Sequence, residues 1–455
     1  MTDGIRREIC SLALPVVFSS LLQRIALIVD LFLIGGLGAA AIAAVGVGQL
    51  LMLTVMTVVW GLAAGTGVIV AQLWGARRQA DAGHVAFQAV LVGAVIGLVI
   101  SAAGVLFSRQ GAIFLGVPDD VLALATPYLR TVFVFFTCSL LVNLISAVMH
   151  GAGNTRSPLY AAVGMNVIHF AVAYPLIHGL WGLPALGVTG VAVATAVSEC
   201  SGAAYLLHIG FKQRHILPGR ISRSMLAPVL RIGLPVLGDR LLQQTGQLLF
   251  VKAVMLYGTV AYAAHQIGMA IEAISFLPGL GISLAATTAV GQRLGAQQIR
   301  QAVRANQEAM RLAVVVMAGI GLIFFVAPTP LLRLFSDDPE VIGLGTTFLM
   351  IAAILQIPMA IALTLAGSLR GAGDTPFLFL STVVGNWAVR VPLAWLCAAV
   401  WHTELAVVWS LMAVDWFVRM GMLVYRVRTD DWHRRVLVHD HGTPPEVSLA
   451  PLRVA

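Results

Sequence analysis

Long apolar runs separated by short polar connections fill most of this chain of 455 residues. A helix needs about 20 mainly apolar residues to cross the roughly 30 Å hydrocarbon core of a bilayer. Runs of this kind occur near residues 9–34, 42–72, 85–107, 121–149, 159–180, 187–210, 229–256, 261–290, 308–328, 340–369, 377–400 and 404–426. The pattern therefore predicts an all-α integral membrane protein with twelve transmembrane helices.

A polar break at residues 211–228 separates the first six runs from the last six. It holds several basic residues and the pair Pro218-Gly219, a composition typical of a linker. We therefore predict an N-lobe at residues 1–210, a cytoplasmic linker at 211–228 and a C-lobe at 229–427. The remaining segment, 428–455, has mixed charge and the pair Pro444-Pro445, which indicates a short disordered tail in the cytoplasm.

The two sets of six runs are related by an internal repeat. A shift of 220 positions places Pro15 on Pro235 and aligns polar and glycine residues over much of each half. The matches include Gln23 with Gln243, Gln72 with Gln292, Gly75-Ala76 with Gly295-Ala296, Gly151-Ala152-Gly153 with Gly371-Ala372-Gly373, and Asn166 with Asn386. Six spans per repeat give both halves the same direction in the membrane, so the pseudo-two-fold axis runs along the membrane normal. We expect the glycine motifs after the fourth and tenth runs to form helix caps and turns.

Composition and charge place the chain in a membrane and exclude several other classes. Hydrophobic residues make up 59% of the chain and charged residues only 11%, whereas a soluble domain has about 25% charged residues. The net charge of +8 comes from basic residues in short connections, where positive charge sets membrane topology rather than binding nucleic acid. Their distribution predicts a multi-pass protein of the cytoplasmic (inner) membrane with both termini in the cytoplasm. The four cysteines show no close pairing in the sequence, which favours helix packing over a disulfide or a metal site.

One carboxylate, Asp30, lies within the first apolar run. Burial in hydrocarbon disfavours the charged form, so an acid kept at such a position usually marks an ion pathway. At about 1.5 Å per residue, Asp30 lies close to the outer end of the run, where a cation from outside reaches it early. A structural pair with Arg24 is the competing interpretation, but six residues is a poor spacing for contact on one helix.

Several segments resemble the MATE (multidrug and toxic compound extrusion) family of transporters. They are Leu14-Pro15 followed by Asp30, Ala263-Ala264-His265-Gln266 through Glu272 to Phe276-Leu277-Pro278, Val290-Gly291-Gln292-Arg293-Leu294-Gly295-Ala296, and Arg370-Gly371-Ala372-Gly373-Asp374-Thr375-Pro376. The resemblance implies a V-shaped carrier of twelve helices that exports amphipathic, often cationic compounds in exchange for inward H⁺ or Na⁺. It makes Asp30 the coupling acid and Pro15 the hinge of the first helix.

The resemblance is incomplete in the fifth and seventh helices. Where many members have a fifth-helix Asp or Asn, near Ala173-Tyr174, this chain has neither, and the nearest polar residues are Asn166, His169 and Tyr174. We assign these three with Asp30 to cation coupling. Gln243 stands where one sodium-coupled branch has a glutamate, which argues against a sodium site in the C-lobe. Coupling is therefore expected in the N-lobe, with protons favoured over Na⁺ at Asp30.

The remaining embedded polar and aromatic residues are candidates for a substrate cavity. The set comprises Gln23, Gln243, Gln266, Met269, Glu272, Phe276, Trp387 and Arg390. Glu272 is equally well explained as a structural ion pair. Asp415 and Arg419, four residues apart, are expected to pair on one helix, and Glu199 is expected to accept an interhelical hydrogen bond rather than to form a second cation site.

The sequence thus predicts a secondary antiporter rather than an enzyme. Its partners are small amphipathic substrates and membrane lipids, it uses no organic cofactor, and it works as a monomer. A flippase for lipid-linked saccharides with a related two-lobe plan is the first alternative, but few embedded basic residues are available to hold a pyrophosphate. An integral-membrane transferase is the second, and it lacks a paired-acid metal motif or an activated nucleophile in the sequence.

Overall fold

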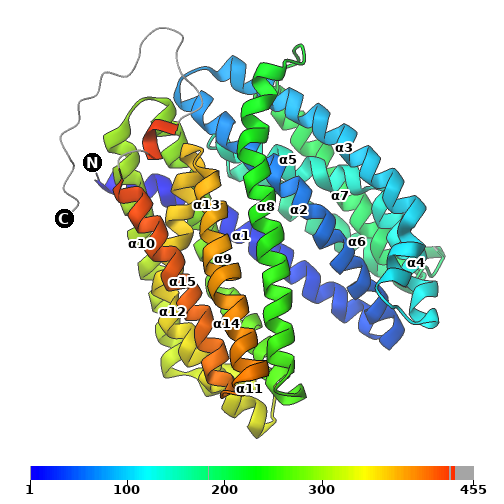
Figure 1. Cartoon of the computed structure of the whole chain (residues 1–455). Coiled ribbons are helices and arrows are strands. Elements are labelled where there is room, and N and C mark those ends of the chain that lie inside the picture. The colour runs from blue at the N-terminus through cyan, green and yellow to red at the C-terminus, as the bar shows by residue number, and fades with distance from the viewer. Residues whose placement is uncertain (1, 183, 430–431, 436–455) are drawn as a thin grey trace. The chain divides into compact units, whose positions relative to one another are not determined.

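The computed structural model of the protein describes residues 2–182, 184–429 and 432–435, and these fold almost entirely into helices (Figure 1). The elements of the N-terminal half are α1 (Thr2–Gly35), α2 (Ala39–Gly75), α3 (Gln79–Phe114), α4 (Asp119–Val134), α5 (Phe136–Gly151), α6 (Arg156–His178), the short turn Leu180–Gly182 and α7 (Val188–Lys212). They are followed by α8 (Arg223–Met255), α9 (Thr259–Gly295), α10 (Ile299–Val326), α11 (Pro328–Arg333), α12 (Pro339–Ala372), α13 (Thr375–Thr382), η2 (Val383–Arg390), α14 (Val391–Trp395), η3 (Leu396–Val400), α15 (Leu405–Arg428) and the turn Trp432–Arg435. No strand occurs among the described residues, as the apolar pattern predicts for a chain whose backbone must satisfy itself inside lipid.

The lengths of the helices confirm a protein that crosses a membrane many times. Ten of the described helices are long and apolar enough to cross a bilayer, or up to eleven if the bent pair α4–α5 is one span. The remaining predicted segment is α8, which is a continuous helix of 33 residues. Its charged residues, among them Asp239, Arg240 and Lys252, set it apart from the other spans.

Two spans differ from the straight helices expected from their apolar runs. The run at 121–149 forms two helices, α4 and α5, that meet at Phe135 with a bend of 48°. Two glycines of α3 allow this broken span to approach closely: a Cβ on Gly104 would overlap the Phe133 ring, and one on Gly97 would crowd Thr137. The run at 377–400 contains two π-helical segments, η2 at residues 383–390 and η3 at residues 396–400. In these segments the backbone hydrogen bonds span five residues instead of four. Such π-segments are frequent at functional sites.

The chain divides into two compact units that do not follow the order of the sequence. One unit contains residues 11–70 and 78–237, and the other contains residues 1–10, 71–77 and 238–455. The division into lobes at 211–228 remains a prediction. In the first unit α3 packs on α4 and α5, and α7 packs on α4, α5 and α6. In the second unit α12 lies at the centre of the bundle, against α9, α10 and α15.

The repeat-matched glycines at the ends of α2 and α9, Gly75 and Gly295, lie where the two helices approach closely. A Cβ added to Gly75 would overlap the carbonyl of Gln292, and a Cβ added to Gly295 would overlap the carbonyl of Gln72. The two helix ends therefore cross in a nearly symmetric contact that only glycine permits. The Gln72 side chain also donates to the carbonyl of Gly371, at 3.0 Å. All of these residues belong to the second unit.

The glycine motifs after α5 and α12 are turns and caps, as predicted. Gly373 caps α12 with φ of 89°, and Gly153 follows α5 with φ of 85°, a left-handed conformation that favours glycine. All four cysteines are free thiols, but two of them that are far apart in the sequence lie close together. The sulfur atoms of Cys138 on α5 and Cys200 on α7 lie 2.7 Å apart, because residues 62 positions apart are brought together by the packing of these two helices.

Candidate functional site

The predicted coupling acid, Asp30, meets a histidine from another helix. Asp30 lies near the end of α1, and its Oδ1 is 2.6 Å from Nε2 of His169 on α6. Only 16% of the Asp30 side chain and 8% of the His169 side chain are exposed. A proton on Nε2 lets His169 donate to the carboxylate, and a second proton on the ring makes the pair an ion pair. Hydrogen bonds of this charged kind are about twice as strong as neutral ones.

Asn166 lies on α6 close to His169. His169 lies about one turn after Asn166, so the two side chains share one side of the helix. The Nδ2 of Asn166 donates to the carbonyl of Ala162, one turn earlier, at 2.8 Å. Its Oδ1 is buried and accepts no hydrogen bond from the described part of the chain. Asn166 thus presents a polar oxygen on the same side of α6 as His169.

A second acid and a tyrosine lie near this pair. Glu199 on α7 is within electrostatic range of His169, and its Oε2 is buried with no hydrogen-bond partner among the described residues. Tyr128 on α4 is buried and is within range of the charge on Asp30. Gly48 on α2 lies directly against the ring of Tyr128, where any Cβ would overlap it. Helices α1, α4, α6 and α7 therefore contribute polar groups to one region of the first unit.

Tyr174, assigned to coupling, and Pro15, assigned to bending, lie outside the contacts just described, and their roles remain predictions. Tyr174 is 52% exposed, and its ring meets the ring of His178 edge-on with 4.9 Å between centroids. Among the described residues, the hydrogen bond given for Asp30 is to His169 and not to Tyr174. Helix α1 continues through Pro15 without interruption, and Ser19 Oγ donates to the carbonyl of Pro15 at 2.8 Å.

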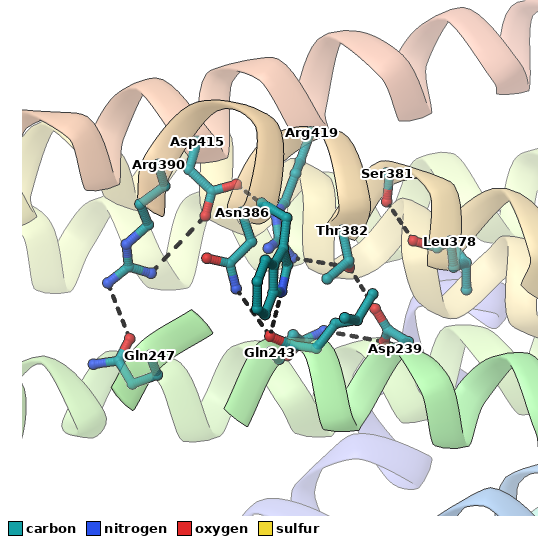
Figure 2. Close-up of polar contacts among 12 residues, drawn as sticks. Asp239, Gln243, Gln247, Leu378, Ser381, Thr382, Asn386, Arg390, Asp415 and Arg419 are labelled. Carbon is teal, nitrogen blue, oxygen red and sulfur yellow. Dashed lines mark hydrogen bonds and ion pairs between the residues drawn. The ribbon is translucent and has the colours of Figure 1, made fainter. Parts of the chain in front are cut away.

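The second unit contains a connected set of charged and polar side chains, drawn in Figure 2. Asp239 on α8 accepts hydrogen bonds from Thr382 and, at 3.0 Å, from Gln243. Thr382 also contacts Arg419 of α15, at 3.3 Å. Arg419 Nε in turn donates to Asp415 Oδ1 at 2.6 Å, so the predicted contact between these residues on α15 is present.

Arg390 extends the same network toward the far end of α8. One of its nitrogen atoms lies 3.9 Å from Asp415 Oδ2, and another donates to Gln247 at 2.9 Å (Figure 2). Its guanidinium also lies over the ring of Phe250, 4.1 Å from the centroid. The joined side chains carry two negative charges, on Asp239 and Asp415, and two positive charges, on Arg390 and Arg419. The network is therefore electrically balanced.

The π-helical segment η2 fits this network against α8. It carries Asn386 and Arg390 toward one side of α8 (Figure 2), and Trp387 of the same segment also contacts this helix. Trp387 Nε1 donates to the carbonyl of Leu242 at 3.0 Å, and Asn386 donates to the same oxygen at 3.4 Å. Gly246 of α8 leaves the room that the Asn386 amide occupies.

Two further polar residues of α9 are buried near Arg390. Glu272 is 6% exposed and lies within range of the charge on Arg390, and its Oε2 has no hydrogen-bond partner in the described part of the chain. His265 is fully buried among the rings of Phe250, Phe348 and Trp409. The side chains of α9 thus add an acid and an imidazole to the interior of the second unit.

The predicted cavity residues fall into three groups. Gln243, Trp387, Arg390 and Glu272 belong to the polar interior just described, whereas Gln23 is exposed and Gln266 is exposed with its amide bonded to Tyr262 at 3.1 Å. Met269 and Phe276 are half-buried. A cavity of about 590 Å³ lies elsewhere, between α11 and the start of α12, and none of these residues lines it.

The sequence interpretation missed three members of the C-terminal network. Asp239, Gln247 and Thr382 received no role, although Asp239 is an acid within a predicted span and follows Pro235 by one turn. The rule that singled out Asp30 applies equally to Asp239. Within the described ranges no three His, Cys, Asp or Glu side chains are placed to hold a metal ion together.

Comparison with known proteins relates the chain to transporters over nearly its whole length. The MatE family model matches residues 15–175 and 235–396, one match in each half. A probable multidrug resistance protein NorM of Thermotoga maritima is 28% identical over 95% of this chain and 94% of its own length. The corresponding protein of Bradyrhizobium diazoefficiens is 30% identical, with 92% of each chain covered.

A solved structure has the same fold. The Vibrio cholerae MATE transporter VcmN in its bent form aligns with a TM-score of 0.87 at 19% identity, covering 95% of this chain and 99% of that one. The two matches of the family model agree with the internal repeat found in the sequence, and the aligned structure agrees with the helical architecture.

Proposed function

Because the chain belongs to the MatE family, whose members are multi-pass membrane transporters and not enzymes, we propose that it exports amphipathic, often cationic compounds in exchange for inward protons. The relatives named as multidrug resistance proteins support export of several compounds rather than of one. The distribution of basic residues supports a cytoplasmic membrane location with both termini inside. Neither the lipid-linked saccharide flippase nor the transferase is supported by a comparable observation.

The contact between Asp30 and His169 is the observation that carries this proposal. When the His169 ring carries one proton it is neutral, and the pair has the net charge of −1 of the Asp30 carboxylate. A second proton makes the pair neutral overall, because the imidazolium balances the carboxylate. Neutralising a charge in a low-dielectric site lowers its desolvation cost, so protonation favours the closed, dehydrated state of this region.

The same geometry favours a proton over Na⁺. A hard cation binds through several oxygen ligands, as the calcium and magnesium sites of proteins do. Here one carboxylate oxygen of Asp30 already accepts a bond from a ring nitrogen, and a protonated His169 would repel a metal cation. Histidine is also the side chain whose charge normally changes near neutral pH. We therefore assign the coupling ion as H⁺, with Asp30 and His169 as the groups that exchange it.

Glu199 is proposed as the second acid of the site. Its buried Oε2 has no hydrogen-bond partner in the described chain, and it lies within electrostatic range of His169. His169 therefore has an acid on each of two helices, α1 and α7. A proton that leaves His169 has Glu199 as a nearby acceptor. Asn166, with its free Oδ1, supplies a polar neighbour on α6.

The test uses purified protein in proteoliposomes with an imposed pH gradient. We expect Asp30→Asn and His169→Leu to abolish proton-driven transport of a fluorescent lipophilic cation, while the dye still binds. His178→Leu is the matched control, because His178 is an exposed histidine of the same helix. Proton release on dye binding is measured as well. Its loss in the two site variants would show that Asp30 and His169 take part in the coupling step.

Two results would contradict the proposal. Transport at the wild-type rate by Asp30→Asn would remove the acid from coupling. Transport that runs on a sodium gradient alone, with no pH gradient, would assign the site to Na⁺.

A further inference from the structure

Cys138 and Cys200 bring two thiols together within the first unit. Their sulfur atoms lie 2.7 Å apart, although the residues are on different helices and 62 positions apart in the sequence. Both side chains are only partly buried. A disulfide needs its two Cβ atoms within about 4 Å and its sulfurs bonded at about 2.05 Å, so only a small shift of the thiols separates them from bonding distance.

The helices that carry these cysteines pack closely beside the proposed coupling site. Helices α5 and α7 are in contact. A Cβ on Gly202, two residues beyond Cys200, would overlap Met165 of α6 and lie against Val142 of α5. Cys200 directly follows Glu199, whose charge acts on Cys138. Cys138 lies in the first turn of α5, just after the bend at Phe135, and its amide donates to the Phe135 carbonyl at 2.9 Å.

We propose that Cys138 and Cys200 are a redox modification site, in which a peroxide converts the two thiols into a disulfide that joins α5 to α7. One thiolate attacks the peroxide, which breaks the O–O bond and leaves a sulfenic acid and an alcohol or water. The second thiol then displaces water from the sulfenic sulfur and forms the S–S bond. Overall two thiols lose two electrons and two hydrogens, and the peroxide is reduced.

The bond has a mechanical consequence for the coupling site. It fixes the start of α5, at the bend of the broken span, to the turn of α7 that carries Glu199. A transport cycle that repacks these helices around His169 then stops, whereas bond formation itself needs no transport. The predicted loss of transport rests on the proposed function, whereas formation of the Cys138–Cys200 disulfide does not.

The cross-link is measured on the full-length protein in membrane vesicles. A protease site is introduced into the connection between α6 and α7, so that cleavage separates the fragment containing α5 from the fragment containing α7. After treatment with hydrogen peroxide, we expect the two fragments to stay joined on a non-reducing gel and to separate with dithiothreitol. Thiol counting in denaturant should fall from four reactive cysteines to two.

Matched single variants identify the bond. Cys138→Ser and Cys200→Ser should each abolish the link, whereas Cys10→Ser and Cys397→Ser should keep it. Because the thiolate is the attacking species, the rate of linking should rise with pH. Fragments that separate completely after peroxide treatment at high pH, or that stay joined in Cys138→Ser, would overturn the site.

Proton-driven dye transport is then compared before and after oxidation. We expect oxidised wild type to lose transport and dithiothreitol to restore it, with no loss in Cys138→Ser under the same treatment. Transport that continues at the original rate in fully cross-linked protein would overturn the mechanical consequence. A wild type without proton-driven transport before oxidation would instead count against the proposed function, and it would leave the cross-link result intact.

Discussion

Asp415→Asn is the sharpest test of the charged network in the second unit. Asp415 is 1% exposed and lies against two guanidiniums, 2.6 Å from Arg419 and 3.9 Å from Arg390. Asparagine keeps the shape of the side chain but removes its charge. The joined network then carries two arginines and only one aspartate, Asp239, and Arg390 and Arg419 lose the carboxylate that lies between them.

The magnitude follows from this change in charge. Removing one partner of a buried ion pair costs about 3–5 kcal/mol, because the other charge stays out of water. Asparagine still accepts a hydrogen bond from Arg419 through its side-chain oxygen, so we expect the lower end, about 3 kcal/mol. This corresponds to a change of more than about 100-fold in the unfolding equilibrium, at 1.4 kcal/mol for each factor of ten.

The measurement is an unfolding titration of purified protein in mixed micelles with sodium dodecyl sulfate, followed by helical circular dichroism. Arg311→Gln is the control, since Arg311 forms an ion pair of 2.8 Å with Glu308 but is 71% exposed. Exposed pairs of this kind contribute less than about 1 kcal/mol, so the control should change little.

A double variant separates charge balance from packing. In Asp415→Asn with Arg419→Met, the remaining charges are those of Asp239 and Arg390, and the network is neutral again. We expect the double variant to be more stable than the sum of the single changes by at least about 1 kcal/mol. Equal effects of Asp415→Asn and Arg311→Gln, or strictly additive single variants, would refute the assignment of a balanced buried network.

Three further expectations concern packing and the linker. Gly246→Ala would place a Cβ onto the Asn386 amide, and we expect a loss of about 1–3 kcal/mol in the same titration, whereas Gly164→Ala on α6, with open space around it, should gain up to about 1 kcal/mol from helix propensity. A stable Gly246→Ala protein would show that η2 does not pack as described. Burial lowers the pKa of His215, which lies after α7 and contacts Gln213 at 3.1 Å. The unfolded chain therefore binds a proton that the folded chain excludes, and stability should rise with pH through the ordinary histidine range near 6.5. His215→Gln should flatten this pH dependence in titrations repeated between about pH 5 and 8, and an unchanged slope would contradict it.

Much of the architecture was predictable because a bilayer leaves few choices to an apolar run. Only a helix satisfies its own backbone in hydrocarbon, so length and composition located the spans. The repeat was visible because contacts such as those of Gly75 and Gly295 tolerate only glycine. The acid in α1 was conspicuous for the same reason, since a carboxylate is costly in an apolar helix.

The tertiary structure decided which side chains meet. Asp30 and His169 are 139 positions apart, Asp239 and Thr382 are 143 apart, and Cys138 and Cys200 are 62 apart. Each contact depends on the rotation and depth of two helices, which result from many small packing terms and not from the pattern along either helix. The sequence by itself thus determined the spans, their repeat and the embedded acid. Only packing decided that the acid has a histidine partner, that Asp239 of α8 meets Thr382, and that two cysteines form a pair.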